Sequence, residues 1–368
     1  MAKIAVAGHI CLDIIPEFFP GKYNPKTLLV PGTLVEVGQA VAATGGAVSN
    51  TGQALHRLGE DVVLIAKVGN DEFGHTVRRL LNRQGAGIAD NLIISPGEHT
   101  SYSIVINPPG IDRIFLHSPG ANHSFSSRDL DEETISGCSL FHFGYPPLMK
   151  CIFERNGAEL KTIFTRMKRR GITTSLDMTF VDPASDAGKI DWPAFLNNVL
   201  PLTDIFLPSL DEILFMTDRD LYFHLTSSAR EELIEQVNAA VIERIAQKLI
   251  DAGVPVVVIK LGAHGLYLRT AEQVPGKDRS WNKQSFFTPA FKVKKGGTTG
   301  AGDCAIAGFL SAYVNGFSAE DALQMAAATG SACVESLDAV SAIPHKDILQ
   351  QRIRDGWMKS PGKFLYKG

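Results

Sequence analysis

Residues 298–303, which read TTGAGD, combine residue types that suit the binding of an anion. Gly300 and Gly302 allow the backbone to turn so that successive N–H groups face one point. An apolar segment typical of a helix follows directly, and a helix N-terminus carries partial positive charge. The stretch therefore predicts an anion hole for a phosphate or a developing negative charge, formed by Gly300, Ala301 and Gly302.

Asp303 stands at the rim of this predicted anion hole. A carboxylate in that place could take a proton from a hydroxyl group as a general base. Aspartate is also common at helix starts as a simple capping residue. From this loop alone, the catalytic and the capping role are equally well supported.

A second glycine cluster, TGGAVSNTG at residues 44–52, also opens a predicted helix. Gly45 and Gly46 would let the backbone approach a ligand closely. Asn50 falls in the first helical turn, where its amide can both donate to and accept from hydroxyl groups. The alternative is an ordinary helix start with Asn50 in solvent, and Asp13 could likewise be a simple turn residue.

Short apolar runs alternate with longer segments of helical periodicity along the chain. This alternation predicts a largely parallel sheet covered by helices on both faces. Ligands of such sheets bind beyond the carboxyl ends of the strands, where Asp13, Asp177, Gly262 and Gly265 are expected. The predicted strands are 3–7, 62–67, 139–143, 173–176, 204–207 and 256–260, and the predicted helices are 47–58, 71–83, 228–251 and 318–336.

Residues 14–44 and 99–120 interrupt this rhythm, because both are β-prone and poor in helical periodicity. We expect them to form a small β-sheet that acts as a lid over a site, although an edge hairpin without such a role is the alternative. The main α/β domain would then comprise residues 1–13, 45–98 and 121–368.

The composition limits the classes of function. The 368 residues include 36 basic and 39 acidic side chains, for a formal net charge of −3, which does not indicate a nucleic-acid partner. Residues 1–15 predict a first strand and not a signal peptide, and no apolar stretch is long enough to span a bilayer.

Five scattered cysteines without a CxxC pair predict reduced thiols in a cytoplasmic protein. Walker A and early GxGxxG motifs are absent.

Taken together and in this order, the two glycine clusters resemble those of the ribokinase-like, or PfkB, carbohydrate kinases. The matching stretches are GGAVSNTGQALHRLG…VGNDEFG at 45–74, RIFLHSPGAN at 113–122, KLGAHG at 260–265 and TTGAGDCAIAGF at 298–309. The resemblance extends from Ala5 to about Pro344. It implies a doubly wound α/β domain with a β-sheet lid that often mediates dimerisation. It also implies transfer of the γ-phosphate of ATP to a sugar or nucleoside hydroxyl, with Mg²⁺.

The resemblance also implies roles for individual residues of this chain. Those implied to be catalytic, as the general base and the anion hole, are Asp303, Gly300, Ala301 and Gly302. Those implied to hold substrate hydroxyls are Asp13, Gly45, Gly46 and Asn50. Those implied to bind ATP are Gly262, Gly265 and Thr299. Glu212 would help to organise Mg²⁺, through water.

The chain departs from the family pattern at three positions. Gly297 stands where the family usually has an aspartate that helps to bind an activating monovalent cation, so we expect weak or no stimulation by K⁺. The family's Asn-x-x-Glu begins with Ser209 here and keeps Glu212. Thr179 stands where the family often has an asparagine.

These features favour an ATP-dependent sugar kinase that acts on a small molecule in the cytoplasm, as a homodimer formed through the lid, without a nucleic-acid or membrane partner. A nucleoside kinase is the first alternative, and it would need an apolar or aromatic slot for a base. A non-catalytic sugar-binding or regulatory protein is the second. The sequence identifies neither the sugar nor the hydroxyl that is phosphorylated.

Overall fold

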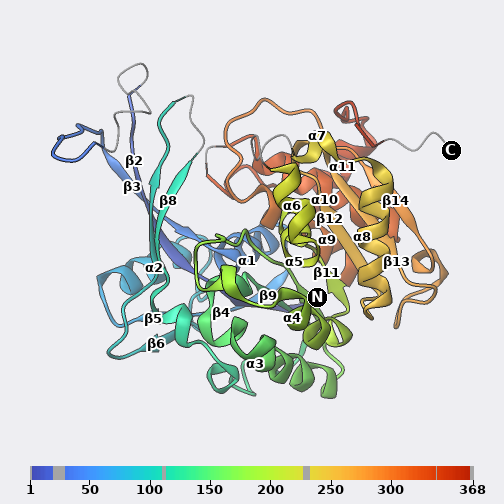
Figure 1. The fold of residues 1–368 in the computed structure, drawn as a ribbon, viewed down its shortest axis with the longest axis horizontal. Coiled ribbons are helices and arrows are strands. Elements are labelled where there is room, and N and C mark those ends of the chain that lie inside the picture. Colours follow the sequence, from blue (N-terminus) through green and yellow to red (C-terminus); the bar gives the residue numbers. More distant parts are fainter. Residues whose placement is uncertain (1, 20–29, 110–112, 227–232, 337, 365–368) are drawn as a thin grey trace.

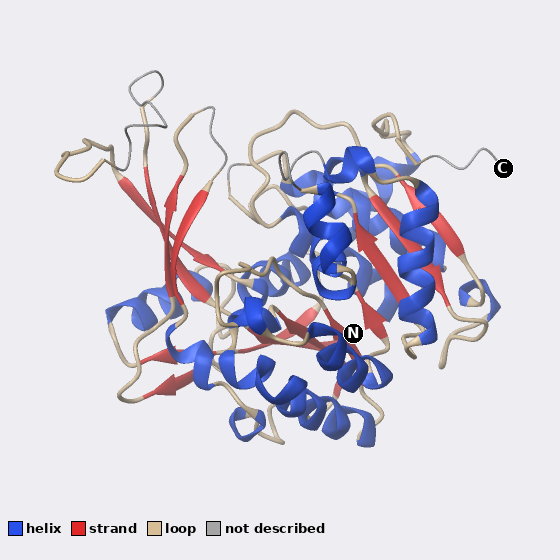
Figure 2. Ribbon diagram, in the orientation of Figure 1, coloured by secondary structure: helices blue, strands red, loops and turns tan. Residues whose placement is uncertain are grey.

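The computed structural model describes residues 2–19, 30–109, 113–226, 233–336 and 338–364. Its main body is a large sheet with strand order β14-β13-β12-β11-β10-β9-β1-β4 (Figure 2). The strands from β4 to β12 are parallel, whereas β13 and β14 are antiparallel. In chain order they are β1 (Lys3–Gly8), β4 (Asp61–Ile65), β9 (Cys138–Gly144), β10 (Thr173–Leu176), β11 (Ile205–Phe206), β12 (Val256–Lys260), β13 (Leu266–Thr270) and β14 (Ser285–Thr288).

Helices cover both faces of this sheet, so the strands are apolar on both sides. In β1, Ala5 and Ala7 pack into one buried cluster, and Ile4 and Val6 pack into the other. The first cluster includes side chains of α3 (Lys150–Arg169), α4 (Trp192–Val199), α5 (Leu210–Thr217) and α8 (Ala239–Asp251). The second includes side chains of α1 (Ala47–Arg57), α2 (Glu72–Asn82), α9 (Ala301–Val314), α10 (Ala319–Cys333) and α11 (Lys346–Arg354). Continuous apolar strands are typical of parallel sheets buried on both faces.

A separate small sheet stands off the main body, with strand order β3-β2-β7-β8 (Figure 1, left). Its strands are β2 (Cys11–Pro16), β3 (Ala40–Gly45), β7 (Tyr102–Ile106) and β8 (Ile114–Ser118). Asp13 pairs with Ala43 on one side and with Ser103 on the other, so these side chains share a face. A further pair, β5 (Lys67–Gly69) and β6 (Ile93–Ser95), is parallel.

The doubly wound α/β fold with a small additional sheet confirms the predicted fold class. One predicted helix, 228–251, is wrong in its extent. The structure describes α6 (Arg219–Leu225), α7 (Leu233–Gln236) and α8 in this region, and residues 227–232 lie outside the described part. The backbone breaks before α8 because the Asn238 side chain accepts a hydrogen bond from the Val241 amide as an N-cap. The predicted division into domains stays a prediction.

Candidate active site

The N-terminus of α9 presents backbone amides at the carboxyl edge of the central sheet. Gly300 caps this helix in a left-handed conformation (φ 72°), and a Cβ there would lie 2.6 Å from the Ala339 Cβ. The Ala301 amide makes one long bond, 3.4 Å, to the Thr298 carbonyl. The amides of Gly302 and Asp303 have no acceptor among the residues that the structure describes. They are therefore available to an anion.

Asp303 lies in the first turn of α9 and is 3% exposed. Its Oδ2 accepts a hydrogen bond from Asn50 Nδ2 at 2.9 Å. The Tyr145 hydroxyl lies 2.8 Å from Oδ1 and 2.9 Å from Oδ2. Burial raises the pKa of Asp303, and the charge of Lys260 and these two hydrogen bonds partly oppose that rise. The carboxylate is thus held in place by α1 and by the end of β9.

Tyr145 is a site residue that the sequence analysis missed. It follows β9 directly in a left-handed conformation (φ 61°, ψ 48°), which is uncommon for a residue with a side chain. Its amide donates to Asp177 Oδ1 at 3.1 Å. Its position just beyond a predicted strand was the only signal in the sequence, and that signal does not indicate where the side chain points.

A buried charged cluster lies beside Asp303. Asp177, after β10, is fully buried, and its Oδ2 has no hydrogen-bond partner among the described residues. Burial raises its pKa well above the usual range despite the charge of Lys260. Burial acts to lower the pKa of Lys260, but Glu212, Asp177 and Asp303 outweigh it and raise that pKa. With Asp211, four carboxyl groups act on this one lysine, and this excess of carboxyl groups would favour the binding of a further cation.

Glu212 has a structural contact as well as a place in this cluster. Its Oε2 accepts a hydrogen bond from the Ser209 amide at 2.7 Å in a capping box at the start of α5, and lies 3.9 Å from Lys260 Nζ. Burial raises its pKa to about 7. No group of three or more His, Cys, Asp or Glu side chains within the described ranges is arranged to hold a metal ion. Magnesium bound to phosphates needs only one or two carboxylates, so this arrangement fits a nucleotide-bound Mg²⁺.

The other predicted substrate residues lie where β1, β2 and α1 meet. Cys11 Sγ donates to Asp13 Oδ1 at 3.3 Å, and burial raises the pKa of Asp13 to about 6. A Cβ on Gly45 would lie 2.3 Å from Asp13 Oδ2, and one on Gly46 would lie 2.6 Å from His9 Nδ1. The two glycines thus make room for the side chains of Asp13 and His9.

A cavity of about 860 Å³ connects these groups. The start of α9 and the loop before it contribute Thr298, Thr299, Gly300 and Asp303 to the lining, and α1 contributes Asn50. The lid and the β1–β2 link contribute further polar side chains: His9, Cys11, Asp13, Ser103, Arg113 and His117. The lining also includes the apolar side chains of Pro147, Leu148, Phe153, Phe180 and Val181, beside the polar Thr179, Asp182, Ser185 and Asp186. The structure therefore brings the two glycine clusters and the lid together around one space.

The residues predicted to bind ATP are more scattered. Thr299 lines the cavity, and both Thr298 and Thr299 contact the guanidinium of Arg113, the former at 3.2 Å. Gly262 and Gly265 lie in the loop after β12 and do not line it. A Cβ on Gly265 would meet the Thr288 carbonyl at 2.0 Å, whereas one on Gly262 would meet no atom within 4 Å. Close packing against the Thr288 carbonyl therefore explains why residue 265 is a glycine.

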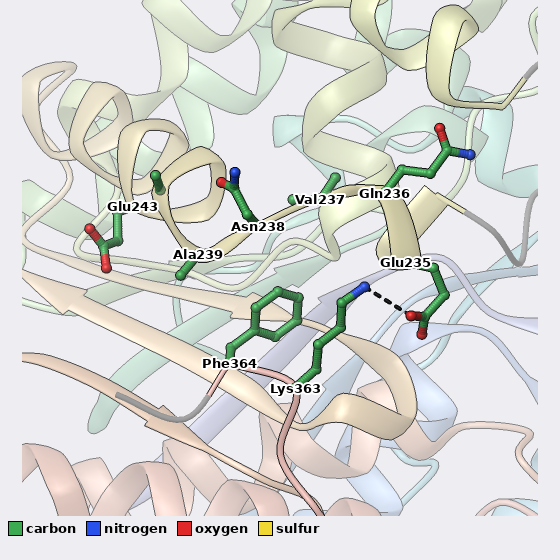
Figure 3. Close-up of a pocket in the computed structure, with 9 residues that line it drawn as sticks. Glu235, Gln236, Val237, Asn238, Ala239, Glu243, Lys363 and Phe364 are labelled. Atoms are coloured by element: carbon green, nitrogen blue, oxygen red, sulfur yellow. Dashed lines mark hydrogen bonds and ion pairs between the residues drawn. The ribbon is translucent and has the colours of Figure 1, made fainter. Parts of the chain in front are cut away.

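A second cavity, of about 600 Å³, adjoins this loop and contains none of the predicted site residues (Figure 3). Residues of α7, α8 and the segment near the C-terminus form its wall, including Glu235, Asn238, Lys363 and Phe364. Lys363 Nζ forms an ion pair with Glu235 Oε2 (dashed in Figure 3), with the two atoms 2.9 Å apart, and Glu235 also contacts His264 at 3.1 Å. Glu235 of α7 thus links the C-terminal segment to the β12–β13 loop through two contacts.

Comparison with known proteins identifies the class to which this fold and site belong. The model of the pfkB family carbohydrate kinases matches residues 1–346, so the chain belongs to that family. It is therefore a phosphotransferase with an alcohol group as acceptor. No helix in the described ranges has the length and apolar character needed to cross a membrane.

Individual relatives are distant but cover most of the chain. Fructokinase-2 of Oryza sativa is 25% identical over 94% of this chain and 92% of its own length. The 2-dehydro-3-deoxygluconokinase of Thermoproteus tenax is 26% identical over 83% of this chain and 84% of its own length. A crystal structure from E. coli, assigned as a ribokinase II in complex with ATP and Mg²⁺, has a TM-score of 0.70 at 23% identity and covers 96% of this chain and all of its own. This similarity to the E. coli structure shows that the two chains share a fold.

Proposed function

We propose that this protein transfers the γ-phosphate of ATP to a hydroxyl group of a sugar or sugar-like substrate, with Asp303 as the general base. The observation that carries the proposal is the position of Asp303. Its carboxylate lies beside the unbonded amides of α9 and lines the same cavity as Asp13 and Asn50. A base next to an anion hole is the arrangement that phosphoryl transfer to an alcohol needs.

Each group has a distinct task in this proposal. Asn50 and Tyr145 hold the carboxylate of Asp303 so that it can accept the proton of the substrate hydroxyl. The amides at residues 300–302 stabilise the negative charge of the transferred group. Asp13 accepts hydrogen bonds from other hydroxyl groups of the substrate. The lid carries Arg113 to the threonines of the α9 loop and limits the access of water.

ATP and Mg²⁺ are the expected cofactors. Mg²⁺ supplies positive charge that neutralises the phosphates during transfer. Asp177 Oδ2, which has no partner among the described residues, and the excess of carboxyl groups around Lys260 suit such a cation, with Glu212 acting through water. Thr299 and the loop at 262–265 are the proposed nucleotide contacts.

The test is ATP-dependent formation of a sugar phosphate, detected by mass spectrometry, with wild type and Asp303→Asn. We expect the variant to lower kcat by roughly 10²–10⁴-fold while sugar binding survives, since only the general base is lost. Asp321→Asn is the matched control, because Asp321 also lies in the first turn of a helix but is exposed. Unchanged turnover in Asp303→Asn would refute the assignment. A wild type that binds sugar without turnover would favour a non-catalytic homologue.

A nucleoside kinase is the second candidate, and the aromatic side chains in the cavity lining favour it. Phe153 and Phe180 there could pack against a base, as an apolar slot requires. Assays with ribose and with adenosine or inosine, side by side, separate the two candidates. A nucleoside kinase would use the nucleosides with the higher kcat/KM and lose that advantage in Phe180→Ala.

We also propose a cytoplasmic homodimer formed through the lid. Ile114 and Leu116 of β8 are 41% and 49% exposed. Strand alternation places them on the face opposite Phe115 and His117, which line the cavity. Exposed apolar side chains on a sheet suit burial against a second copy. Leu116→Lys should convert the dimer to a monomer in analytical ultracentrifugation, and a wild-type monomer would refute this proposal.

A further inference from the structure

His9 is a buried polar side chain whose hydrogen-bonding groups the protein leaves unused. It is 2% exposed, and neither Nδ1 nor Nε2 has a hydrogen-bond partner within the described ranges. Its backbone, by contrast, is fully bonded, because its amide donates to the Gly144 carbonyl and its carbonyl accepts from the Val48 amide. Buried polar groups in proteins are nearly always paired. Two unpaired ring nitrogens on a rigidly held residue therefore point to a partner outside the chain.

His9 lines the part of the cavity where the sugar is proposed to bind. It lines that space together with Asp13 and Ser103, and its centroid lies 5.2 Å from that of His117 in the lid and 6.1 Å from that of Tyr145. Gly46 has no side chain to cover Nδ1, since a Cβ there would lie only 2.6 Å away. The glycine at the start of α1 thus makes room for the imidazole ring, whose two nitrogens are buried without a partner among the described residues.

The charges along the cavity restrict the chemistry of that ligand. Arg113 is the one lysine or arginine among the described residues of the lining, and its guanidinium lies on Thr298 and Thr299 at the α9 end. The other charged groups of the lining are carboxylates: Asp13, Asp182, Asp186 and Asp303. Burial, followed by the charges of His117 and His123, lowers the pKa of His9 well below its usual value. Among the described lining residues, the side that holds Asp13 therefore offers carboxylates and imidazoles of lowered pKa, and no cation other than Arg113.

We propose that His9 is a specificity-determining residue that binds hydroxyl groups of a neutral polyol jointly with Asp13, so that the site prefers an uncharged sugar to a sugar acid. The proposal rests on the kinase function proposed above. A neutral imidazole supplies one donor and one acceptor, and Asp13 supplies acceptors, which suits adjacent hydroxyl groups. A carboxylate on the substrate would instead meet like charge at Asp13. Among the relatives, this favours a substrate of the fructokinase kind over 2-dehydro-3-deoxygluconate.

The first experiment compares acceptors with the wild-type protein. D-fructose, D-ribose and 2-dehydro-3-deoxygluconate are assayed with ATP and Mg²⁺, and kcat/KM is determined for each. We expect at least one neutral sugar to exceed the acid by roughly 10-fold or more. A kcat/KM for the acid above that of both neutral sugars would overturn this inference and leave the kinase proposal intact. Phosphorylation of none of them would count against the kinase proposal.

The second experiment replaces His9. His9→Phe keeps a flat ring and removes both nitrogens, so KM for the preferred neutral sugar should rise roughly 10- to 100-fold with kcat changed less than about 3-fold. His9→Gln retains a donor and an acceptor and should restore part of the loss. A merely structural or hydrated His9 would leave KM unchanged in His9→Phe, and that result would overturn the inference.

Calorimetric binding of the sugars without ATP supplies a readout that needs no turnover. Wild type should bind the neutral sugar, His9→Phe should bind it roughly 10-fold or more weakly, and His9→Gln should lie between them. If His9→Phe does not fold, His9→Gln and the wild-type acceptor series decide the question. Equal affinities of wild type and His9→Gln, together with preference for the acid, would refute it.

Discussion

The two sides of the cavity differ in how completely the protein satisfies its own polar groups. On the α9 side, the carboxylate of Asp303 accepts hydrogen bonds from Asn50 and Tyr145, and the helix amides are held in place by a glycine turn. On the lid side, His9 has no hydrogen-bond partner for its ring among the described residues, and the partly buried Asp13 is hydrogen-bonded by the small side chains of Cys11 and Ser103. The comparison suggests that the chemical machinery is preorganised, whereas the acceptor side is completed by the substrate.

This difference predicts that changes on the α9 side lower kcat and that changes on the lid side raise KM. A residue that acts in the transition state affects turnover, whereas a residue that binds ground state and transition state alike affects KM. The following variants test that distinction.

Gly300→Ala should have the largest effect of this set. Residue 300 has a positive φ, and a Cβ would lie 2.6 Å from the Ala339 Cβ, so the start of α9 must shift. We expect kcat to fall roughly 10²–10³-fold, as for loss of a donor in an anion hole. Gly316→Ala is the control, because Gly316 also has a positive φ but has open space around it. A kcat within about 2-fold of wild type would contradict the proposed anion hole.

Asp13→Asn should act mainly on substrate binding. The amide cannot accept as many hydrogen bonds as the carboxylate, so KM for the sugar should rise roughly 10- to 100-fold with a smaller effect on kcat. Burial raises the pKa of Asp13 to about 6. If the ionised form binds the sugar, wild-type KM should rise as pH falls below about 6, and Asp13→Asn should lack that rise. A decrease in kcat with unchanged KM would contradict the proposed difference between the two sides of the cavity.

Tyr145→Phe should affect catalysis through Asp303. The phenol donates to the carboxylate and so opposes the rise in the pKa of Asp303 that burial causes. Its loss raises this pKa further and leaves less of the base ionised at a given pH. We expect kcat/KM to fall about 10-fold near neutral pH and its acidic limb to move to higher pH. Tyr313→Phe, a buried tyrosine of α9 away from the cavity, should leave the profile in place.

Exchange of Na⁺ for K⁺ should have the smallest effect. Gly297 offers no carboxylate near the loop before α9, so the rate should change less than about 2-fold. Initial rates at constant ionic strength measure this directly. Strong stimulation by K⁺ would show that other oxygen atoms hold the cation.

Much of the fold was predictable because its signals are local. The helices predicted at 47–58, 71–83 and 318–336 correspond to α1, α2 and α10 within a few residues at each end. Apolar periodicity, capping residues and glycines after helices are properties of short windows. The order of the two glycine clusters also pointed to the family that the comparison confirmed.

The sequence by itself determined the elements, the glycine turns and the acid at the start of α9. The tertiary structure alone decided which side chains meet that acid. Tyr145 and Asp303 lie 158 residues apart, and Asn50 and Asp303 lie 253 apart. Their contacts depend on strand order and on the direction of each side chain at the sheet edge. Local periodicity carries no information on either, because they follow from the packing of the whole chain.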